Sequence, residues 1–223
     1  PLVSVIVPMF NAEAFVGNAI ASIQQETATP LEIIVVDDGS TDISLKRVQQ
    51  IQDDRIRVIH LPTHAGIATA LNMGLDLAQG EIIMRCDADD VYPARRITRQ
   101  ADWLLKHPDF DAVCGNYSTI DAAGQLVVAF NCGDKPEDIT QELRNGITRT
   151  HFCTFAIRAR VLQRLDGFRQ YFCTSEDIDF QLRLGDLYRI WYLPEILYHY
   201  RIHATSITHT QGDSERQFFE LKA

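Results

Sequence analysis

The first 120 residues alternate between short β-branched runs and segments with a helical spacing of apolar residues, and this alternation limits the fold most strongly. Residues 32–36 are a run of Ile and Val of the kind that parallel sheets bury on both faces. Strands that alternate with helices connect through right-handed crossovers into a mainly parallel sheet covered by helices. The sequence therefore predicts a doubly wound α/β fold. The expected strands are residues 4–7, 32–36, 55–59 and 81–85, and the expected helices are residues 12–25, 42–52, 67–78 and 93–107.

The pattern is looser after Val113. We expect two strands around a turn within residues 111–131, a helix at 137–145, a strand at 151–157, a helix after an acidic cluster at 175–179, and a strand pair near 188–202. No repeat, low-complexity tract or linker divides the chain, so we expect one domain over residues 1–223. Because the chain stops within a segment that looks helical, residues 214–222, we also expect more protein to follow.

Composition and charge exclude several classes of protein. The 223 residues carry a formal net charge of -9, whereas proteins that bind a nucleic-acid backbone need a basic face. An anionic ligand such as a diphosphate would require a bound cation beside these acidic groups. The sequence has no apolar run of roughly 20 residues, no N-terminal signal segment and no CxxC pair among its five cysteines. We expect a cytoplasmic protein with no nucleic-acid partner.

Polar residues follow three of the predicted strands, at residues 8–11, 37–40 and 87–90. Ligands of doubly wound folds bind beyond the carboxyl ends of the strands, so these segments predict the site. Asp87 and Asp89 alternate at a strand end, which suits a hard cation such as Mg²⁺ or Mn²⁺, although a solvated acidic loop has the same composition. In the second segment, Asp38 is the residue expected to contact a ligand, and Asp37 is expected to accept hydrogen bonds from the backbone of the turn that follows.

Two further clusters could carry chemistry. Residues 175–179 place Glu176, Asp177 and Asp179 at the start of a predicted helix, where negative charge is favourable by itself; that account fits Asp179 well. A general base is the alternative, with Asp177 as first candidate and Glu176 as second. Near the end of the chain, His199 and His203 could share a helix face and bind zinc. If the segment is instead a strand, two other interpretations are favoured over zinc binding: one of the histidines lies near a diphosphate or a metal, or the histidine is structural.

Six motifs in order resemble the family 2 glycosyltransferases of GT-A fold, and the likeness covers nearly the whole chain. They are SVIVPMFN (residues 4–11), EIIVVDDGSTD (32–42), GIATALNMG (66–74), GEIIMRCDADD (80–90), SEDID (175–179) and YRIH (200–203). The resemblance implies a nucleotide-sugar-binding half over residues 1–120 and an acceptor-side half over residues 121–223. Many relatives carry Arg immediately before the Asn that matches Asn72, whereas this chain has Leu71.

The resemblance also assigns roles to single residues. Asp177 would be the catalytic base, and Asp89 and His203 would bind or approach the metal, Mn²⁺ or Mg²⁺. The residues expected to contact substrate are Pro8, Phe10 and Asp38 in the nucleoside pocket, with Asn11, Asp87 and Glu176.

The function implied is inverting transfer of a sugar from a nucleotide-diphosphate donor, a UDP-sugar being favoured, to a glycan or lipid-linked acceptor. Lipid-linked acceptors leave room for a peripheral association with the inner membrane. Two other enzyme classes are disfavoured by the segment after the first strand. A sugar-nucleotide pyrophosphorylase would need a Gly-rich basic loop there, and a Rossmann dehydrogenase would need a GxGxxG motif, but residues 8–11 contain neither. The alternative from another class is a catalytically inactive module that binds a sugar nucleotide or a glycan.

Overall fold

The structure, a computed structural model, describes residues 1–172 and 174–204, so the helix expected at 214–222 lies outside the described residues. In chain order the elements are β1 (Val3–Met9), α1 (Val16–Gln24), β2 (Leu31–Asp37), α2 (Ser44–Gln49), β3 (Ile56–His60), α3 (Ile67–Leu77), β4 (Ile82–Arg85), α4 (Arg96–Lys106), β5 (Ala112–Ile120), β6 (Leu126–Phe130), β7 (Glu137–Asp138), α5 (Thr140–Arg144), the 3-10 helix η1 (Phe152–Thr154), β8 (Ala156–Arg158), α6 (Ala159–Arg164), α7 (Glu176–Leu187) and β9 (Ile190–Arg201).

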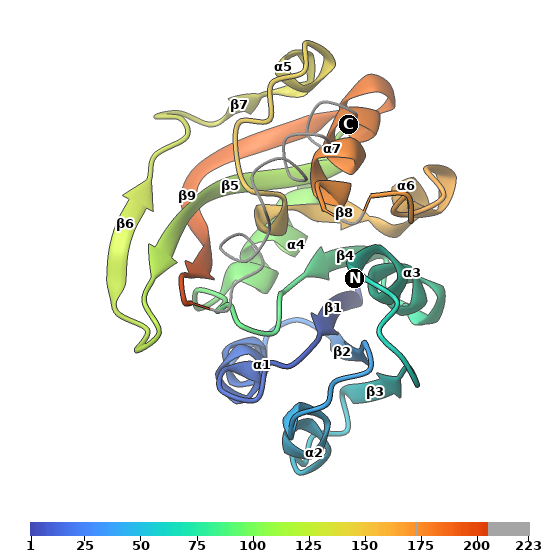
Figure 1. Ribbon diagram of the computed structural model, residues 1–223. Coiled ribbons are helices and arrows are strands. Elements are labelled where there is room, and N and C mark those ends of the chain that lie inside the picture. Colours follow the sequence, from blue (N-terminus) through green and yellow to red (C-terminus); the bar gives the residue numbers. More distant parts are fainter. Residues whose placement is uncertain (173, 205–223) are drawn as a thin grey trace.

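One continuous sheet runs through both halves of the described chain, in the order β3-β2-β1-β4-β8-β5-β9-β7, with β6 paired to β5 (Figure 1). Strands β1 to β4 are parallel, as the alternation of the sequence predicts. The second half is mixed, because β8 runs antiparallel to both β4 and β5 whereas β9 runs parallel to β5. The α/β fold class is confirmed. The strand order reverses at β1, between β2 and β4, which is where such folds bind ligands.

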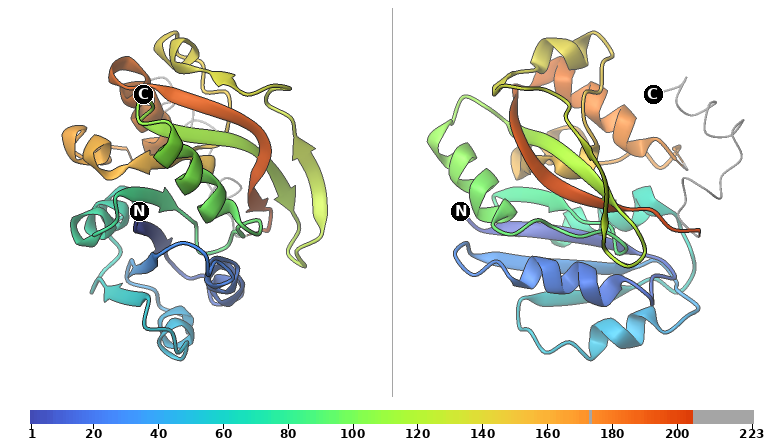
Figure 2. Two further views of the ribbon diagram at one scale, coloured as in Figure 1. Left: turned by 180° about the vertical axis from the view of Figure 1, so that it is seen from behind. Right: turned by 90° about the vertical axis from the view of Figure 1, so that its left-hand side faces the viewer.

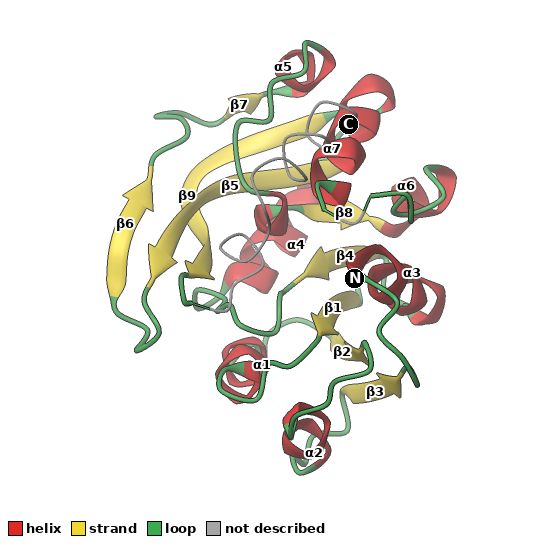
Figure 3. Cartoon of the chain, viewed as in Figure 1, coloured by secondary structure: helices red, strands yellow, loops and turns green. Residues whose placement is uncertain are grey.

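Helices cover both faces of the sheet (Figure 3). Helices α1, α2 and α4 contribute to the core on one face, and α3, α6 and α7 contribute to the core on the other. Figure 1 shows α1 and α3 on opposite sides of β1 and β4. None of the helices within the described ranges is long and apolar enough to cross a membrane.

Strand β1 extends two residues farther than the sequence predicts, through Pro8 to Met9, where we expected Pro8 to close it. Proline cannot donate to a ladder and is normally excluded from central strands. Here β4 pairs with β1 only as far as Arg85 opposite Ile6, so Pro8 lies beyond the paired residues on that side. Its other neighbour, β2, remains in register, with Val36 opposite Pro8.

The second half departs most from expectation. The strand pair expected near 188–202 is wrong: β9 is a single long strand that runs beside β5, with register shifts around Asn116 (Figure 2). The helix expected at 137–145 is the short strand β7 followed by α5, and the strand expected at 151–157 is η1 followed by β8. In the helix expected at 42–52, the spacing of Ile43, Val48 and Ile51 predicts that all three face the core, but Ile43 is 49% exposed.

Candidate active site

The loops after β1 and β2 are joined directly at the carboxyl end of the sheet. The Asn11 N–H donates to Ser40 Oγ at 2.9 Å, and Asn11 Oδ1 accepts from the Thr41 N–H at 2.8 Å. Asn11 has a left-handed backbone, with φ of 48°, which Asn tolerates better than most residues. The side chain expected to contact substrate therefore also holds the two loops together.

Asp37 has the structural role that the sequence indicates. Its side chain is fully buried at the end of β2. One oxygen, Oδ1, accepts from the Ser40 N–H at 3.2 Å, and Oδ2 lies 2.7 Å from His60 Nδ1. Asp37 thus bonds both the turn after its own strand and the end of β3.

Asp38 shapes the loop after β3. Its two carboxylate oxygens accept from the N–H groups of Ala65 and Gly66, at 2.7 and 2.9 Å, and Oδ2 also lies 2.9 Å from His64 Nδ1. The ring of His64 stacks on Phe10, with 4.1 Å between ring centroids and 29° between planes. Asp38 is buried under this stack, and Pro8 is buried within β1.

The Phe10–His64 ring pair is exposed at the strand ends. Phe10 is 45% exposed, and the His64 side chain is 55% exposed. A flat, half-exposed pair of rings is a surface on which a nucleobase can stack. The sequence indicates Phe10 but gives no sign of His64, because the loop of residues 61–66 has no motif of its own.

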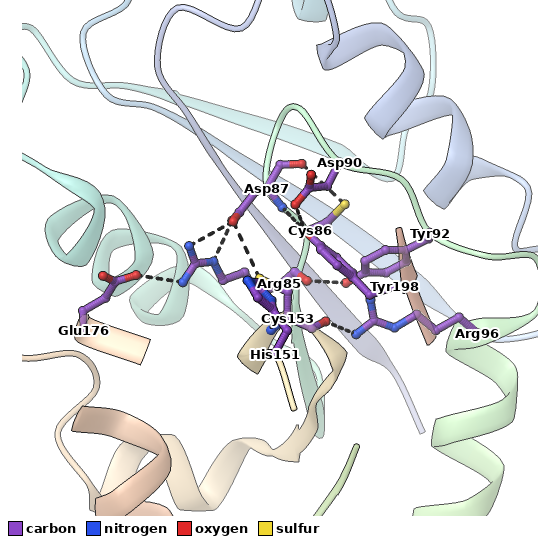
Figure 4. A network of polar contacts seen from close by, with 10 residues as sticks. All are labelled: Arg85, Cys86, Asp87, Asp90, Tyr92, Arg96, His151, Cys153, Glu176 and Tyr198. Atoms are coloured by element: carbon purple, nitrogen blue, oxygen red, sulfur yellow. Dashed lines mark hydrogen bonds and ion pairs between the residues drawn. The ribbon is translucent and has the colours of Figure 1, made fainter. Parts of the chain in front are cut away.

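Arg85, the last residue of β4, links two of the expected site residues (Figure 4). Its Nε and Nη2 lie 2.6 and 3.0 Å from the two carboxylate oxygens of Asp87, and its Nη1 lies 2.9 Å from Glu176 Oε1. Both Asp87 oxygens are therefore occupied by a guanidinium. Sequence reasoning missed Arg85, since no local pattern shows which acids it meets.

Burial and charge act in opposite balance on the two members of this ion-pair network. It raises the pKa of Glu176 to about 7, with the charge of Asp177 acting in the same direction and that of Arg85 in the opposite one. For Arg85, burial opposes the charged form, but the negative charges around it, with Asp87 foremost, raise its pKa well above the usual value. The arginine is thus a fixed cation, whereas Glu176 can gain or lose a proton near neutral pH.

Asp89 and His203 lie together, as the resemblance implies. His203 Nε2 is 3.0 Å from Asp89 Oδ2, and the His203 ring packs against Phe15, with 4.6 Å between ring centroids. Burial raises the pKa of Asp89, with the charge of Asp87 adding to the rise and His203 opposing it. Within residues 1–172 and 174–204, no three His, Cys, Asp or Glu side chains form a metal-binding group. The chain brings two candidate ligands together here.

Asp90 fastens this loop to β9, a role that the sequence does not reveal. Its fully buried carboxylate accepts from the Tyr198 hydroxyl at 2.6 Å and from the Arg201 N–H at 2.7 Å. Arg201 in turn donates from Nε to the Asp89 carbonyl oxygen at 2.6 Å. Burial raises the pKa of Asp90 well above its usual value, with the charge of Asp89 adding to the rise. These contacts fix the backbone at Asp89.

Asp177 lies in the first turn of α7, where its Oδ1 accepts from the N–H of Ile178 at 2.9 Å. It is less buried than Glu176, whose side chain is 6% exposed. His151, which the sequence analysis did not single out, is close enough to interact with it: burial lowers the pKa of His151, and the charge of Asp177 opposes that change. Asp179 lies in the first turn of α7, where we expected its charge to favour the helix start, and it also forms ion pairs with Arg169 and Arg183 that the sequence did not indicate.

The zinc alternative for the C-terminal histidines does not match the local structure. His199 lies within strand β9, and its Nδ1 is 2.6 Å from Ser118 Oγ. His203 follows the end of that strand and contacts Asp89. The two histidines therefore do not share a helix face, as the zinc interpretation would require.

Comparison with known proteins decides the family. The sequence profile described as "Glycosyl transferase family 2" matches residues 4–166. The chain belongs to glycosyl transferase family 2. An uncharacterized glycosyltransferase of Haemophilus influenzae is 31% identical to this chain, and the aligned region covers 97% of this chain and 72% of the relative. Glycosyltransferase GlyG of Streptococcus pneumoniae is 30% identical, covering 95% and 74%. The chain spans 56% of a second uncharacterized H. influenzae glycosyltransferase.

A solved structure of S. aureus TarS residues 1–349 in complex with UDP-GlcNAc matches with a TM-score of 0.80 and 22% identity, over 99% of this chain and 64% of TarS 1–349. At that identity the likeness shows the fold alone, and it confirms the GT-A type of sheet. Leu71, where many family 2 glycosyltransferases carry Arg, is 1% exposed and belongs to the core cluster that contains Ile6 and Ile83. In this family 2 chain, position 71 packs against the sheet.

Proposed function

We propose that this family 2 glycosyltransferase transfers a sugar from a UDP-sugar to a hydroxyl group of a glycan or lipid-linked acceptor, with inversion at the anomeric carbon and with Mn²⁺ or Mg²⁺. One observation carries the proposal: side chains from separate elements that suit a cation and a proton acceptor meet at two aspartates, Asp87 and Asp89, of the loop after β4. Phe15, which follows β1, contacts His203; His203 contacts Asp89; and Arg85 connects Asp87 with the start of α7.

The nucleoside of the donor would bind at the loops after β1, β2 and β3. The Phe10–His64 ring pair offers a stacking surface, and Asp38 holds the loop that carries His64. The solved TarS structures include complexes with UDP and with UDP-GlcNAc, which favours UDP as the nucleotide here.

Asp89 and His203 would hold the cation. Their side chains meet at 3.0 Å, and a hard cation that retains phosphate oxygens and waters needs only one or two protein ligands. Asp87 is less suited, because both its oxygens are bonded to Arg85. When bound, the cation would supply charge neutralisation for the departing diphosphate.

Asp177 would act as general base. The acceptor hydroxyl attacks the anomeric carbon while the bond from that carbon to the diphosphate oxygen breaks, and the hydroxyl proton passes to the Asp177 carboxylate. No covalent intermediate is needed. Glu176 is the weaker candidate, because its carboxylate is buried and bonded to Arg85, whereas Asp177 is more exposed beside it.

Asp177→Asn tests the assignment, since it keeps the shape but removes the basic lone pair. Turnover of a UDP-sugar panel should fall by about 10² to 10⁴, with UDP affinity unchanged. Glu176→Gln should cost less. The product of an α-linked donor should have the opposite anomeric configuration, read by NMR from the anomeric proton coupling. Retention, or near-normal turnover in Asp177→Asn, would overturn the mechanism. UDP-sugar binding without any turnover by the wild type would favour the inactive binding module.

A further inference from the structure

Arg85 connects two parts of the molecule that are 91 residues apart in sequence. Nε and Nη2 hold Asp87, at the carboxyl end of β4, and Nη1 holds Glu176, the first residue of α7. Asp177, the proposed base, is the next residue. A single buried guanidinium therefore bridges the loop after β4 and the helix turn that carries Asp177.

Besides the Arg85 contact, the start of α7 is held by Asp179, which lies in the same first turn and pairs with Arg169 and Arg183. Its N-cap residue, Ser175, has a left-handed backbone with φ of 64° and makes no side-chain capping hydrogen bond. The contact between Arg85 and Glu176 thus anchors, through a side chain, a helix end that has no side-chain cap.

We propose that Arg85 is a positioning residue for the transfer reaction, because it fixes the first turn of α7, and with it Asp177, relative to the donor-side carboxylate Asp87. This inference rests on the proposed function. Arg85 acts through other residues, since all three of its nitrogens already bond carboxylate oxygens. Its loss should therefore displace the base while the donor still binds.

The same helix supplies a matched control. Arg183 lies one turn beyond Asp179 on α7, bonds that first-turn carboxylate, and donates to the carbonyl oxygens of Leu165 and Gly167. The Arg85 and Arg183 side chains are similarly buried, at 10% and 15% exposure. Arg183 anchors α7 to the segment after α6, far in sequence from the strand-end loops. Its loss should weaken the helix but leave the link between Asp87 and Glu176 intact.

The experiment compares Arg85→Met, Arg85→Lys and Arg183→Met with the wild type. UDP affinity is measured by calorimetry with Mn²⁺, kcat with the UDP-sugar that the wild type turns over fastest, and Tm by thermal unfolding. Arg85→Met should bind UDP normally and lose about 10² in kcat, the loss expected when a reacting group is misplaced by about 1 Å. Arg85→Lys keeps the charge but not the fork, so its kcat should lie between those of Arg85→Met and the wild type. Arg85→Lys also carries the test if Arg85→Met does not fold. Folding could fail in Arg85→Met because Glu176, which is buried, and Asp87, which is 20% exposed, would both lose their cation.

Arg183→Met should lower Tm and retain wild-type kcat. Equal kcat losses in the Arg85 and Arg183 variants at similar Tm would show that general loosening of α7 is responsible, and would overturn the positioning role. Normal kcat in a folded Arg85→Met would also overturn it, while the proposed function would stand. A wild type that binds UDP but turns over no sugar donor would contradict the proposed function itself, and the role of Arg85 with it.

Discussion

Glu176→Gln should remove a pH dependence of stability that this one buried carboxyl group contributes. Burial raises the pKa of Glu176 from its ordinary 4.5 to about 7 in the folded protein. The folded state therefore binds a proton more tightly than the unfolded state. Stability from this group is fully present below pH 4.5 and is lost as the pH rises through 7. Between pH 5 and pH 8, these two pKa values correspond to a loss of roughly 2 to 3 kcal/mol.

The assay is urea unfolding of the wild type and Glu176→Gln at pH 5 and pH 8. The free energy of unfolding of the wild type, minus that of the variant, should fall by roughly 2 to 3 kcal/mol over this range. Asp53→Asn is the control, because hydrogen bonds from Arg55 and Gln24 lower the pKa of Asp53 below its ordinary 3.8, and it stays ionised throughout. Its difference from the wild type should not change with pH. A Glu176 difference that is constant, or that grows with pH, would refute the reasoning.

Three further predictions concern the donor side. Asp89→Ala should weaken UDP binding, measured by calorimetry with Mn²⁺. Adding EDTA to this variant should weaken binding no further, because the substitution and the chelator remove the same metal bridge. A wild-type UDP affinity that does not change with EDTA would exclude the metal assignment. His203→Ala should reduce UDP affinity while Tm holds, whereas a fall in Tm alone would make His203 structural. Phe10→Ala should raise the Kd for UDP about tenfold by removing one stacking ring, and an unchanged Kd would place the base elsewhere.

The sequence predicts the parts of the fold and site that depend on local pattern. The parallel strands β1 to β4 follow from β-branched runs alternating with helices, and the carboxyl ends of such strands must meet at one edge. That is why residues 8–11, 37–40 and 87–90 could be expected together before any contact was known. Asp37 and Asp179 could also be assigned structural roles, because turns and helix starts have local chemistry of their own.

Long-range side-chain contacts are what the sequence does not reveal. From the sequence, Arg85 is predicted only as the polar last residue of an apolar strand, and no neighbouring residue indicates its contact with Glu176. Tyr198 and Asp90 are 108 residues apart, and their bond depends on β9 running beside β5 as one strand, where the pattern predicts two. The position of His64 likewise depends on side chains that are distant in sequence, since it contacts Asp38 and stacks on Phe10. Periodicity fixes which face of an element is buried, but it does not say which polar side chains meet across elements.

The three aspartates of the DADD segment differ in chemistry because they differ in partners. The Asp87 carboxylate is bonded through both oxygens to a permanent cation, Arg85. The Asp90 carboxylate is fully buried between a hydroxyl and a backbone N–H. Asp89, by contrast, is 31% exposed at its side chain and contacts an imidazole. Mutual repulsion disfavours three carboxylates so close together, and fixed donors on Asp87 and Asp90 offset it; in the proposed mechanism the third carboxylate, Asp89, binds the divalent cation. This division of roles explains why Asp89, and not Asp87, is the metal ligand in the proposed mechanism.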